Sequence, residues 1–129
     1  MISTSNLEQA KKLIKKEKQP IVVLAKDNNF NRKILEHGKF QILENPKEIN
    51  HIMARIASKN NISISYDLSK IAKLEKKNKA QTLEKIIPIL KTLRKAKTKL
   101  KITNFKDKKD ASSFLITLGA STFQTKEAF

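Results

Sequence analysis

The sequence predicts an α/β protein built on a parallel sheet, and three observations carry this prediction. Short apolar runs of strand length alternate with segments whose apolar residues recur every three or four positions. Helix-capping residues and prolines mark the boundaries between the two kinds of segment. The chain has 129 residues and no cysteine, which suits a single domain over residues 1–129 without disulfide bonds or thiolate metal sites.

The chain is expected to open with a helix and a strand. Ser5 stands three residues before Glu8, the spacing of a capping box, and a helix is expected within residues 1–19. Pro20 stops this helix. Ile21 to Ala25 then form a continuous apolar run, which is typical of a parallel strand buried on both faces.

The next two helices carry their own boundary residues. Asp27 or Asn28 caps a short helix that ends at Gly38, and a second strand follows over residues 40–43. Pro46 is expected in the first turn of the third helix, where proline is tolerated. The apolar stripe of this third helix consists of Ile49, Ile52, Met53 and Ile56.

The second half of the chain contains the clearest amphipathic helix, over residues 80–96. Before it, residues 62–66 form a third strand and residues 69–78 form a Lys-rich loop or a frayed helix. Pro88 falls on the outward face, so we expect a bend rather than a break. Residues 100–103 form the fourth strand. The apolar stripe of the long helix consists of Leu83, Ile86, Ile87, Leu90 and Leu93.

A last helix, capped by Asp110 and ended by Gly119, completes the order α-β-α-β-α-β-α-β-α. This order predicts parallel strands joined by right-handed crossovers. Four strands are too few to close a (β/α)₈ barrel, so an open sheet or partial barrel of about four βα units is expected. Its two edges need cover from the terminal segments or from a partner.

Positive charge is concentrated in one third of the chain. The sequence carries 28 Lys and Arg residues against 12 acidic residues, a net charge of +16. Residues 69–109 hold 15 of the basic and 3 of the acidic residues, a net charge of +12. The phosphates of a nucleic acid would neutralise this concentration of positive charge, so contact with nucleic acid is predicted. The lysines expected to face phosphates are Lys85, Lys91, Lys95, Lys97, Lys99, Lys101, Lys106, Lys108 and Lys109.

The ratio of lysine to arginine, 25 to 3, indicates how RNA is bound. Lysine supplies point charges, whereas arginine forks favour base reading, so tracking of the RNA backbone is expected. Phe40, Tyr66 and Phe105 are expected in the core, which leaves no paired platform for stacking bases. No run of about 18 apolar residues and no signal-peptide core occur. A cytoplasmic protein without membrane contact is therefore expected.

Four acidic residues follow the predicted strands, where parallel α/β proteins bind ligands: Asp27, Glu44, Asp67 and Asp107. These acidic residues need no catalytic role, because a short polar residue after a strand is also what the next helix needs as its N-cap. His37 and His51 lack metal-ligand spacing, and His51 is expected to face away from the core. The chain has no Gly-rich phosphate loop. We therefore expect no catalytic site, metal or cofactor in this chain, and a residual phosphoesterase is the least favoured hypothesis.

Several ordered segments carry a family resemblance. They are NRKILE (residues 31–36), FQIL (40–43), INHIMARIA (49–57), NNISI (60–64), ITN (102–104) and the stretch from Lys109 to Gly119. In this order they resemble segments of ribonuclease P protein component 3, over about residues 20–120. A helix over residues 1–19 precedes this core and a tail over residues 121–129 follows it.

The resemblance implies a TIM-barrel-like fold, related to the PHP phosphoesterases but without a working metal site. It also implies a ribonucleoprotein, of an archaeal and eukaryotic type, whose RNA removes the 5′ leader of precursor tRNA. The implied partners are ribonuclease P RNA, precursor tRNA and other protein subunits. The opening strands of the family barrel are absent, and Lys109 replaces an arginine of the family pattern. Further candidates for RNA or partner contact are Asn31, Arg32, Asn50 and His51.

An alternative from another class is a basic protein-interaction module. An open partial barrel exposes a sheet edge, through which the chain would form a homo-oligomer or dock on another RNA-binding subunit. This alternative requires no role in ribonuclease P.

Overall fold

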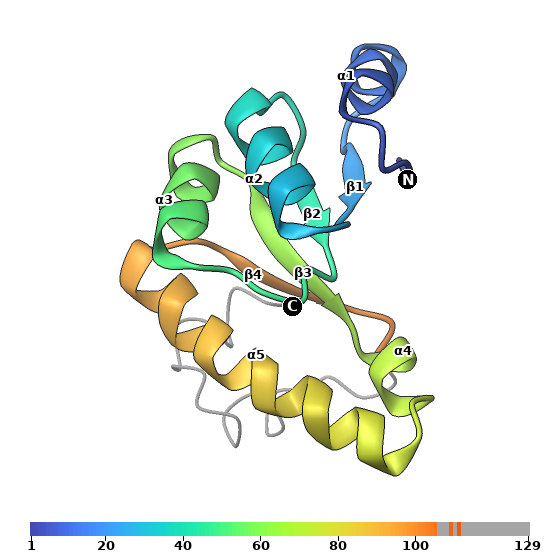
Figure 1. The fold of residues 1–129 in the computed structure, drawn as a ribbon, viewed down its shortest axis with the longest axis vertical. Helices are drawn as coiled ribbons and strands as arrows, with labels where there is room; N and C mark the ends of the chain where they lie inside the picture. Colours follow the sequence, from blue (N-terminus) through green and yellow to red (C-terminus); the bar gives the residue numbers. More distant parts are fainter. Residues whose placement is uncertain (106–108, 110, 112–129) are drawn as a thin grey trace.

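The four strands form one parallel sheet, which is open rather than closed into a barrel (Figure 1). The computed structural model describes residues 1–105, 109 and 111. The strands are β1 (Val22–Leu24), β2 (Ile42–Glu44), β3 (Ser63–Asp67) and β4 (Leu100–Thr103), in the order β1-β2-β3-β4. The predicted α/β class and the partial, TIM-barrel-like sheet are confirmed.

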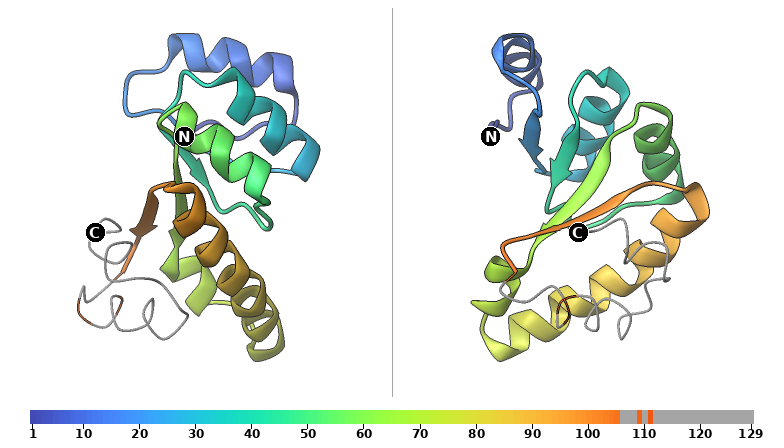
Figure 2. Two further views of the ribbon diagram at one scale, coloured as in Figure 1. Left: turned by 90° about the vertical axis from the view of Figure 1, so that its left-hand side faces the viewer. Right: turned by 180° about the vertical axis from the view of Figure 1, so that it is seen from behind.

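The helices in the described part of the chain are α1 (Leu7–Lys16), α2 (Asn28–His37), α3 (His51–Lys59), α4 (Leu68–Ala72) and α5 (Lys76–Ala96). Because parallel crossovers are right-handed, a sheet whose strand order follows the chain places its connecting helices on one face. Figures 1 and 2 show α2, α3 and α5 side by side on that face. The predicted alternation is confirmed, with one addition. Residues 69–78, expected as a loop or frayed helix, contribute to α4 and to the start of α5.

The last predicted helix, from Asp110 to Gly119, lies largely outside the described residues. Of this region the structure describes Lys109, which is exposed, and Ala111, which is buried.

Side-chain caps begin the first two helices. The Asp27 side chain accepts a hydrogen bond of 2.7 Å from the backbone N–H of Phe30, so the predicted cap of α2 is confirmed. Asn6, rather than the predicted Ser5, caps α1 by accepting from Gln9 at 3.0 Å. Both side chains suit an N-cap, and their order in the sequence does not decide between them.

The third helix begins later than predicted. Asn50 caps α3 by accepting a hydrogen bond of 2.8 Å from the backbone N–H of Met53. The prediction that Pro46 lies in the first turn of this helix is therefore wrong. Pro46 lies in the loop after β2, where its carbonyl accepts a hydrogen bond from the hydroxyl of Tyr66 at 2.8 Å.

Alternate residues of the sheet meet two different environments. Val23, Leu43, Ile64 and Leu100 pair in register across the four strands, and each is at most 1% exposed. They belong to the same core cluster as the buried residues of the helices. The next register row carries Leu24, Glu44, Ser65 and Lys101, so in this row the opposite face of the sheet is apolar at β1 and polar along β2, β3 and β4. Only one face of the sheet is therefore an apolar core.

Two predicted core residues are instead exposed. Ile52 on α3 is 52% exposed and Ile87 on α5 is 46% exposed, whereas Ala54 and Ile89 are buried. The rest of the predicted stripe of α3 does face the core, because Ile49 and Met53 are buried and Ile56 packs against the core, so only Ile52 lies beyond its edge. Residues 86–90 are an apolar run around Pro88, and such a run does not indicate which of its members face the core. Pro88 itself is exposed within an unbroken α5, as predicted.

The aromatic residues follow their predicted burial with one exception. Phe40 and Tyr66 are 2% and 5% exposed, but Phe105 is 36% exposed. Phe40 lies before β2, which begins two residues later than predicted. The predicted core position of Phe105 is wrong, because this residue follows the end of β4.

The N-terminal segment covers the edge of β1. Ile2 pairs in parallel with Val23, and it donates to the carbonyl of Val22 and accepts from the N–H of Leu24, each at 2.8 Å. The prediction that a terminal segment covers one edge is confirmed here. No helix of the described residues is both long enough and apolar enough to cross a lipid bilayer.

Gly38 ends α2 in a conformation that other residues avoid. Its φ is +68° with ψ −149°, and an added Cβ would lie 3.4 Å from Nδ2 of Asn60. Replacing Gly38 with alanine is expected to lower the free energy of unfolding by about 1–3 kcal/mol. Urea denaturation measures this loss. Lys33→Ala, an exposed substitution in the same helix, is the control and should change stability by less than about 0.5 kcal/mol. An unchanged midpoint for the glycine variant would contradict the expected strain.

Candidate nucleic-acid interface

Helix α5 presents lysines away from the core. Its buried face consists of Ile86, Ile89, Leu90 and Leu93. At about 100° per residue, Lys91 and Lys95 lie on the opposite side of the helix, and both are exposed. Neither forms an ion pair with any residue of the described part of the chain. The outward face of α5 therefore carries positive charge that these residues leave unneutralised.

Three further lysines gather at the amino-terminal edge of the sheet, after the end of α5. Lys97, Lys99 and Lys101, hereafter the amino-edge lysines, line a hollow of about 310 Å³. Lys97 ends α5 in the left-handed conformation, with φ +57°, and thereby turns the chain toward β4. The other residues that line the hollow are Gln41, Ile42, Ser58, Asn61, Ile62 and Ser63. No acidic residue of the described chain lines this hollow.

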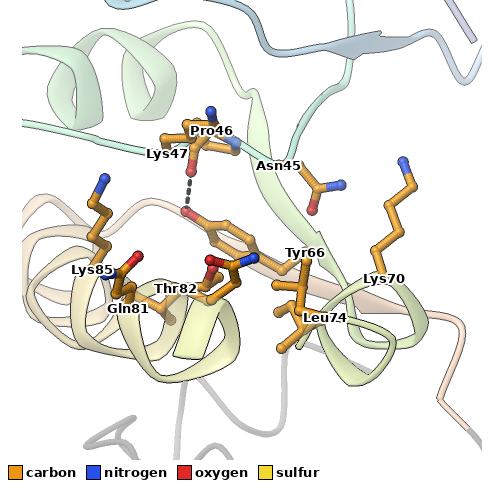
Figure 3. Close-up of a pocket in the computed structure, with 12 residues that line it drawn as sticks. Asn45, Pro46, Lys47, Tyr66, Lys70, Leu74, Gln81, Thr82 and Lys85 are labelled. Atoms are coloured by element: carbon orange, nitrogen blue, oxygen red, sulfur yellow. Dashed lines mark hydrogen bonds between the residues drawn. The ribbon is translucent and has the colours of Figure 1, made fainter. Parts of the chain in front are cut away.

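Lys85 belongs to a separate site at the opposite end of the sheet. It lies 12 residues before Lys97 on α5, about 18 Å along the helix axis. There it joins Lys47, from the loop after β2, and Lys70, from α4, around a pocket of about 410 Å³ (Figure 3). We call this the carboxyl-edge pocket. Its other lining residues are Asn45, Pro46, Tyr66, Ile71, Leu74, Asn78, Gln81, Thr82 and Ile86.

A second hollow, of about 530 Å³, adjoins the carboxyl-edge pocket. Asn45, Lys47 and Lys85 line both, so together they make one groove along the carboxyl ends of β1, β2 and β3. Lys47 was not predicted as a site residue. The available signal was its position after a parallel strand, where ligands of α/β folds bind.

The structure does not bring all of the predicted phosphate-facing residues together. Arg32 lies on α2, where its Nε is 3.4 Å from Oε1 of Glu36. His51 is the exposed first residue of α3, as predicted for its orientation. Neither residue lines the amino-edge hollow or the groove. Lys106 and Lys108 lie outside the described residues.

Asn31 is a structural residue, so the prediction of an RNA or partner contact there is wrong. It is fully buried, its Oδ1 accepts from the N–H of Lys26 at 2.7 Å and its Nδ2 donates to the carbonyl of Lys26 at 3.2 Å. Asn60 acts similarly, since its Nδ2 donates to the carbonyl of Leu35 at 2.8 Å. With Asn50 capping α3, three asparagines of the family-like segments hold the backbone in place.

The acidic residues after the strands divide into two kinds. Asp27 and Asp67 cap α2 and α4, as predicted, and Asp67 also accepts from Nδ2 of Asn104 at 2.7 Å. Glu44 does not cap a helix, because α3 begins seven residues later. It is 6% exposed, and its Oε2 has no hydrogen-bond partner among the described residues. Asp107 lies outside those residues.

The same face of the sheet holds two more buried polar atoms without a partner among the described residues. Oγ of Ser65 and Oγ1 of Thr103 are buried without a hydrogen bond within the described residues. These residues lie on β3 and β4, on the same face as Glu44. No group of three or more His, Cys, Asp or Glu residues that would hold a metal ion occurs in the part of the chain that the structure describes.

Two titratable side chains have pKa values shifted from their ordinary values. Burial raises the pKa of Tyr66 well above its ordinary value of 10, and its hydroxyl is committed to the carbonyl of Pro46. Burial lowers the pKa of His37 below its ordinary value of 6.5, and the charges of Lys11, Lys39 and Lys15 lower it further.

Comparison with known proteins gives a structural match. No protein-family model matches the chain, and no curated protein matches it. A chain in the cryo-EM structure of archaeal ribonuclease P with mature tRNA is similar, with a TM-score of 0.84 and 23% sequence identity. The match covers 97% of this chain and 61% of that chain. The protein therefore shares its fold with a chain of that assembly, and it spans about three fifths of that chain's length.

Proposed function

We propose that this protein is a non-catalytic RNA-binding subunit of ribonuclease P, of the component 3 kind. In this role it supports the catalytic RNA in removing the 5′ leader of precursor tRNA. Its partners are ribonuclease P RNA, precursor tRNA and other protein subunits. The proposal treats residues 1–129 as one α/β domain and places it in the cytoplasm. It assigns no catalytic residue to the chain.

The observation that carries the proposal is the set of exposed lysines on α5 and the amino edge. Lys91, Lys95, Lys97 and Lys99 are all exposed, and none pairs with an acidic side chain in the described part of the chain. Such unneutralised charge costs folding free energy through self-repulsion, and a polyanion relieves it. The fold shared with a chain of archaeal ribonuclease P supports the choice of RNA as that polyanion.

The arrangement favours phosphates over bases as the main contacts. The charges stand on the outward face of α5 and around the amino-edge hollow, and no paired aromatic platform for bases is among the residues that line this hollow. Lysine ammonium groups are point charges that suit single phosphates. Binding of folded RNA should therefore depend strongly on salt and weakly on sequence.

The salt dependence of RNA binding tests the proposal. The purified chain is titrated with ribonuclease P RNA and with precursor tRNA from the source cell, between 0.05 and 0.3 M salt. Four phosphate contacts predict that the logarithm of the affinity falls with a slope of about −3 to −4 against the logarithm of salt. An affinity insensitive to salt would rule out the proposed binding mode. Binding without any effect on leader cleavage in the reconstituted enzyme would favour the protein-interaction module instead.

A further inference from the structure

The carboxyl-edge pocket differs from the amino-edge hollow because it combines its lysines with an aromatic ring, that of Tyr66. Lys47, Lys70 and Lys85 come from a loop, α4 and α5, and Figure 3 shows Lys85 and Lys70 on opposite sides of the Tyr66 ring. No acidic residue of the described chain lines the pocket itself, whereas Asp27 and Glu48 line the adjoining hollow. Charges of one sign around a concave site with low-dielectric walls focus the field, so the pocket attracts an anion.

Part of the pocket wall is apolar, which a phosphate alone does not need. Ile71 and Ile86 are 7% and 5% exposed, while Leu74 is 37% exposed at the rim. Figure 3 shows the ring of Tyr66 between Leu74 and Pro46, and the Tyr66 hydroxyl donates a hydrogen bond to the carbonyl of Pro46. A ligand that carries a flat apolar group and an anion would contact the apolar part of the pocket with the first and its lysines with the second. A nucleotide has this composition.

One face of α5 supplies hydrogen-bonding groups to the same pocket. Asn78, Gln81, Thr82 and Lys85 are spaced i, i+3, i+4 and i+7, so they lie on one side of the helix. The side chains of Asn78 and Gln81 have no hydrogen bond to any residue of the described chain. Each amide offers two donors and an acceptor oxygen, the groups that pair with base edges. Asn45 accepts from the N–H of Asp67 at 3.2 Å and keeps its own amide donors for a ligand.

We propose that the carboxyl-edge pocket accepts one unpaired nucleotide of the bound RNA, with the base against the apolar wall and its phosphate near Lys47 and Lys85. The proposal rests on the proposed function and specifies how one part of the RNA is read. A base in a duplex does not reach such a pocket, so the nucleotide comes from a loop, a bulge or an end. A volume of about 410 Å³ is in the range of small-molecule sites.

Calorimetric titration of the full chain with adenosine and uridine 5′-monophosphate tests the pocket. Ribose 5-phosphate and inorganic phosphate are titrated in parallel. At least one nucleotide should bind about tenfold more tightly than ribose 5-phosphate, because only the nucleotide places a base on the apolar wall. Equal binding of all four compounds would overturn the proposal, since it would show an anion site without a base.

A matched pair of variants locates the binding. Lys85→Gln should weaken nucleotide binding about tenfold, whereas Arg94→Gln should change it less than about twofold, because Arg94 is exposed on the same helix outside the pocket. Thr82→Phe, which fills the pocket from α5, should abolish nucleotide binding while circular dichroism shows an intact fold. Equal losses for Lys85→Gln and Arg94→Gln, or displacement of the nucleotide by a polyglutamate peptide, would overturn the proposal.

The two proposals fail in different ways. If nucleotides do not bind but ribonuclease P RNA still binds with a steep salt slope, the pocket proposal fails and the proposed function stands. If neither binds, both fail.

Discussion

Replacing Lys91, Lys95 and Lys99 together with glutamine is expected to weaken binding of ribonuclease P RNA about 100-fold at 0.15 M salt. With a slope of about 0.9 per phosphate contact, relative to the affinity at 1 M salt, each contact raises the affinity for RNA roughly fivefold at 0.15 M salt. The three lysines are exposed and unpaired in the described part of the chain, so their loss breaks no interaction that this part provides to the fold. The salt slope should also become shallower by about 3 units.

A control with equal charge separates local contacts from net charge. Lys12, Lys15 and Lys16 are exposed on α1 and at its end, and Figure 1 shows α1 at the opposite end of the molecule from α5. Glutamine at these three positions removes the same charge and should weaken RNA binding less than about fivefold. Fluorescence anisotropy with labelled RNA measures both variants. Equal losses in the two variants would show that only the net charge matters.

Replacing Asn31 with alanine is expected to lower the free energy of unfolding by about 3 kcal/mol. The substitution removes two hydrogen bonds and leaves the N–H and carbonyl of Lys26 without their partner in a partly buried place. Each unsatisfied backbone group costs about 1–3 kcal/mol. The buried site also loses the volume of the amide group. Urea denaturation measures the effect.

Asn29 provides the matched control for this variant. It is an exposed asparagine in the first turn of the same helix, and no hydrogen bond to its side chain occurs in the described structure. Asn29→Ala should change stability by less than about 0.5 kcal/mol. The RNA affinity of folded Asn31→Ala should equal that of the original protein. A large loss of affinity with unchanged stability would restore Asn31 as a contact residue.

Much of the fold was predictable because it depends on local periodicity. Apolar runs and helical stripes gave the order of elements, and β4 was placed at its observed residues. Errors arose where two neighbours were chemically equivalent. Ser5 and Asn6 both suit a cap, and Ile87 and Ile89 are equally apolar, so only packing distinguishes them.

The candidate sites were predictable only in part, because tertiary packing creates them. The concentration of lysine between residues 69 and 109 is a property of the sequence, and exposure on α5 follows from its periodicity. The meeting of Lys47 with Lys85 depends on how α5 packs beside the loop after β2. Glu44 stands in the sequence like a capping residue, yet it points to the polar face of the sheet.

The contact of Ile2 with β1 has a consequence for how the protein behaves at high concentration. An edge strand with free N–H and C=O groups is a template on which strands of other molecules add, and such addition leads to aggregation. Ile2 uses the carbonyl of Val22 and the N–H of Leu24, the outward groups of a strand that is only three residues long. A short strand with these two groups occupied offers little to an incoming chain. The pairing of Ile2 with β1 therefore both extends the hydrogen bonding of the sheet and hinders the addition of strands from other molecules at this edge.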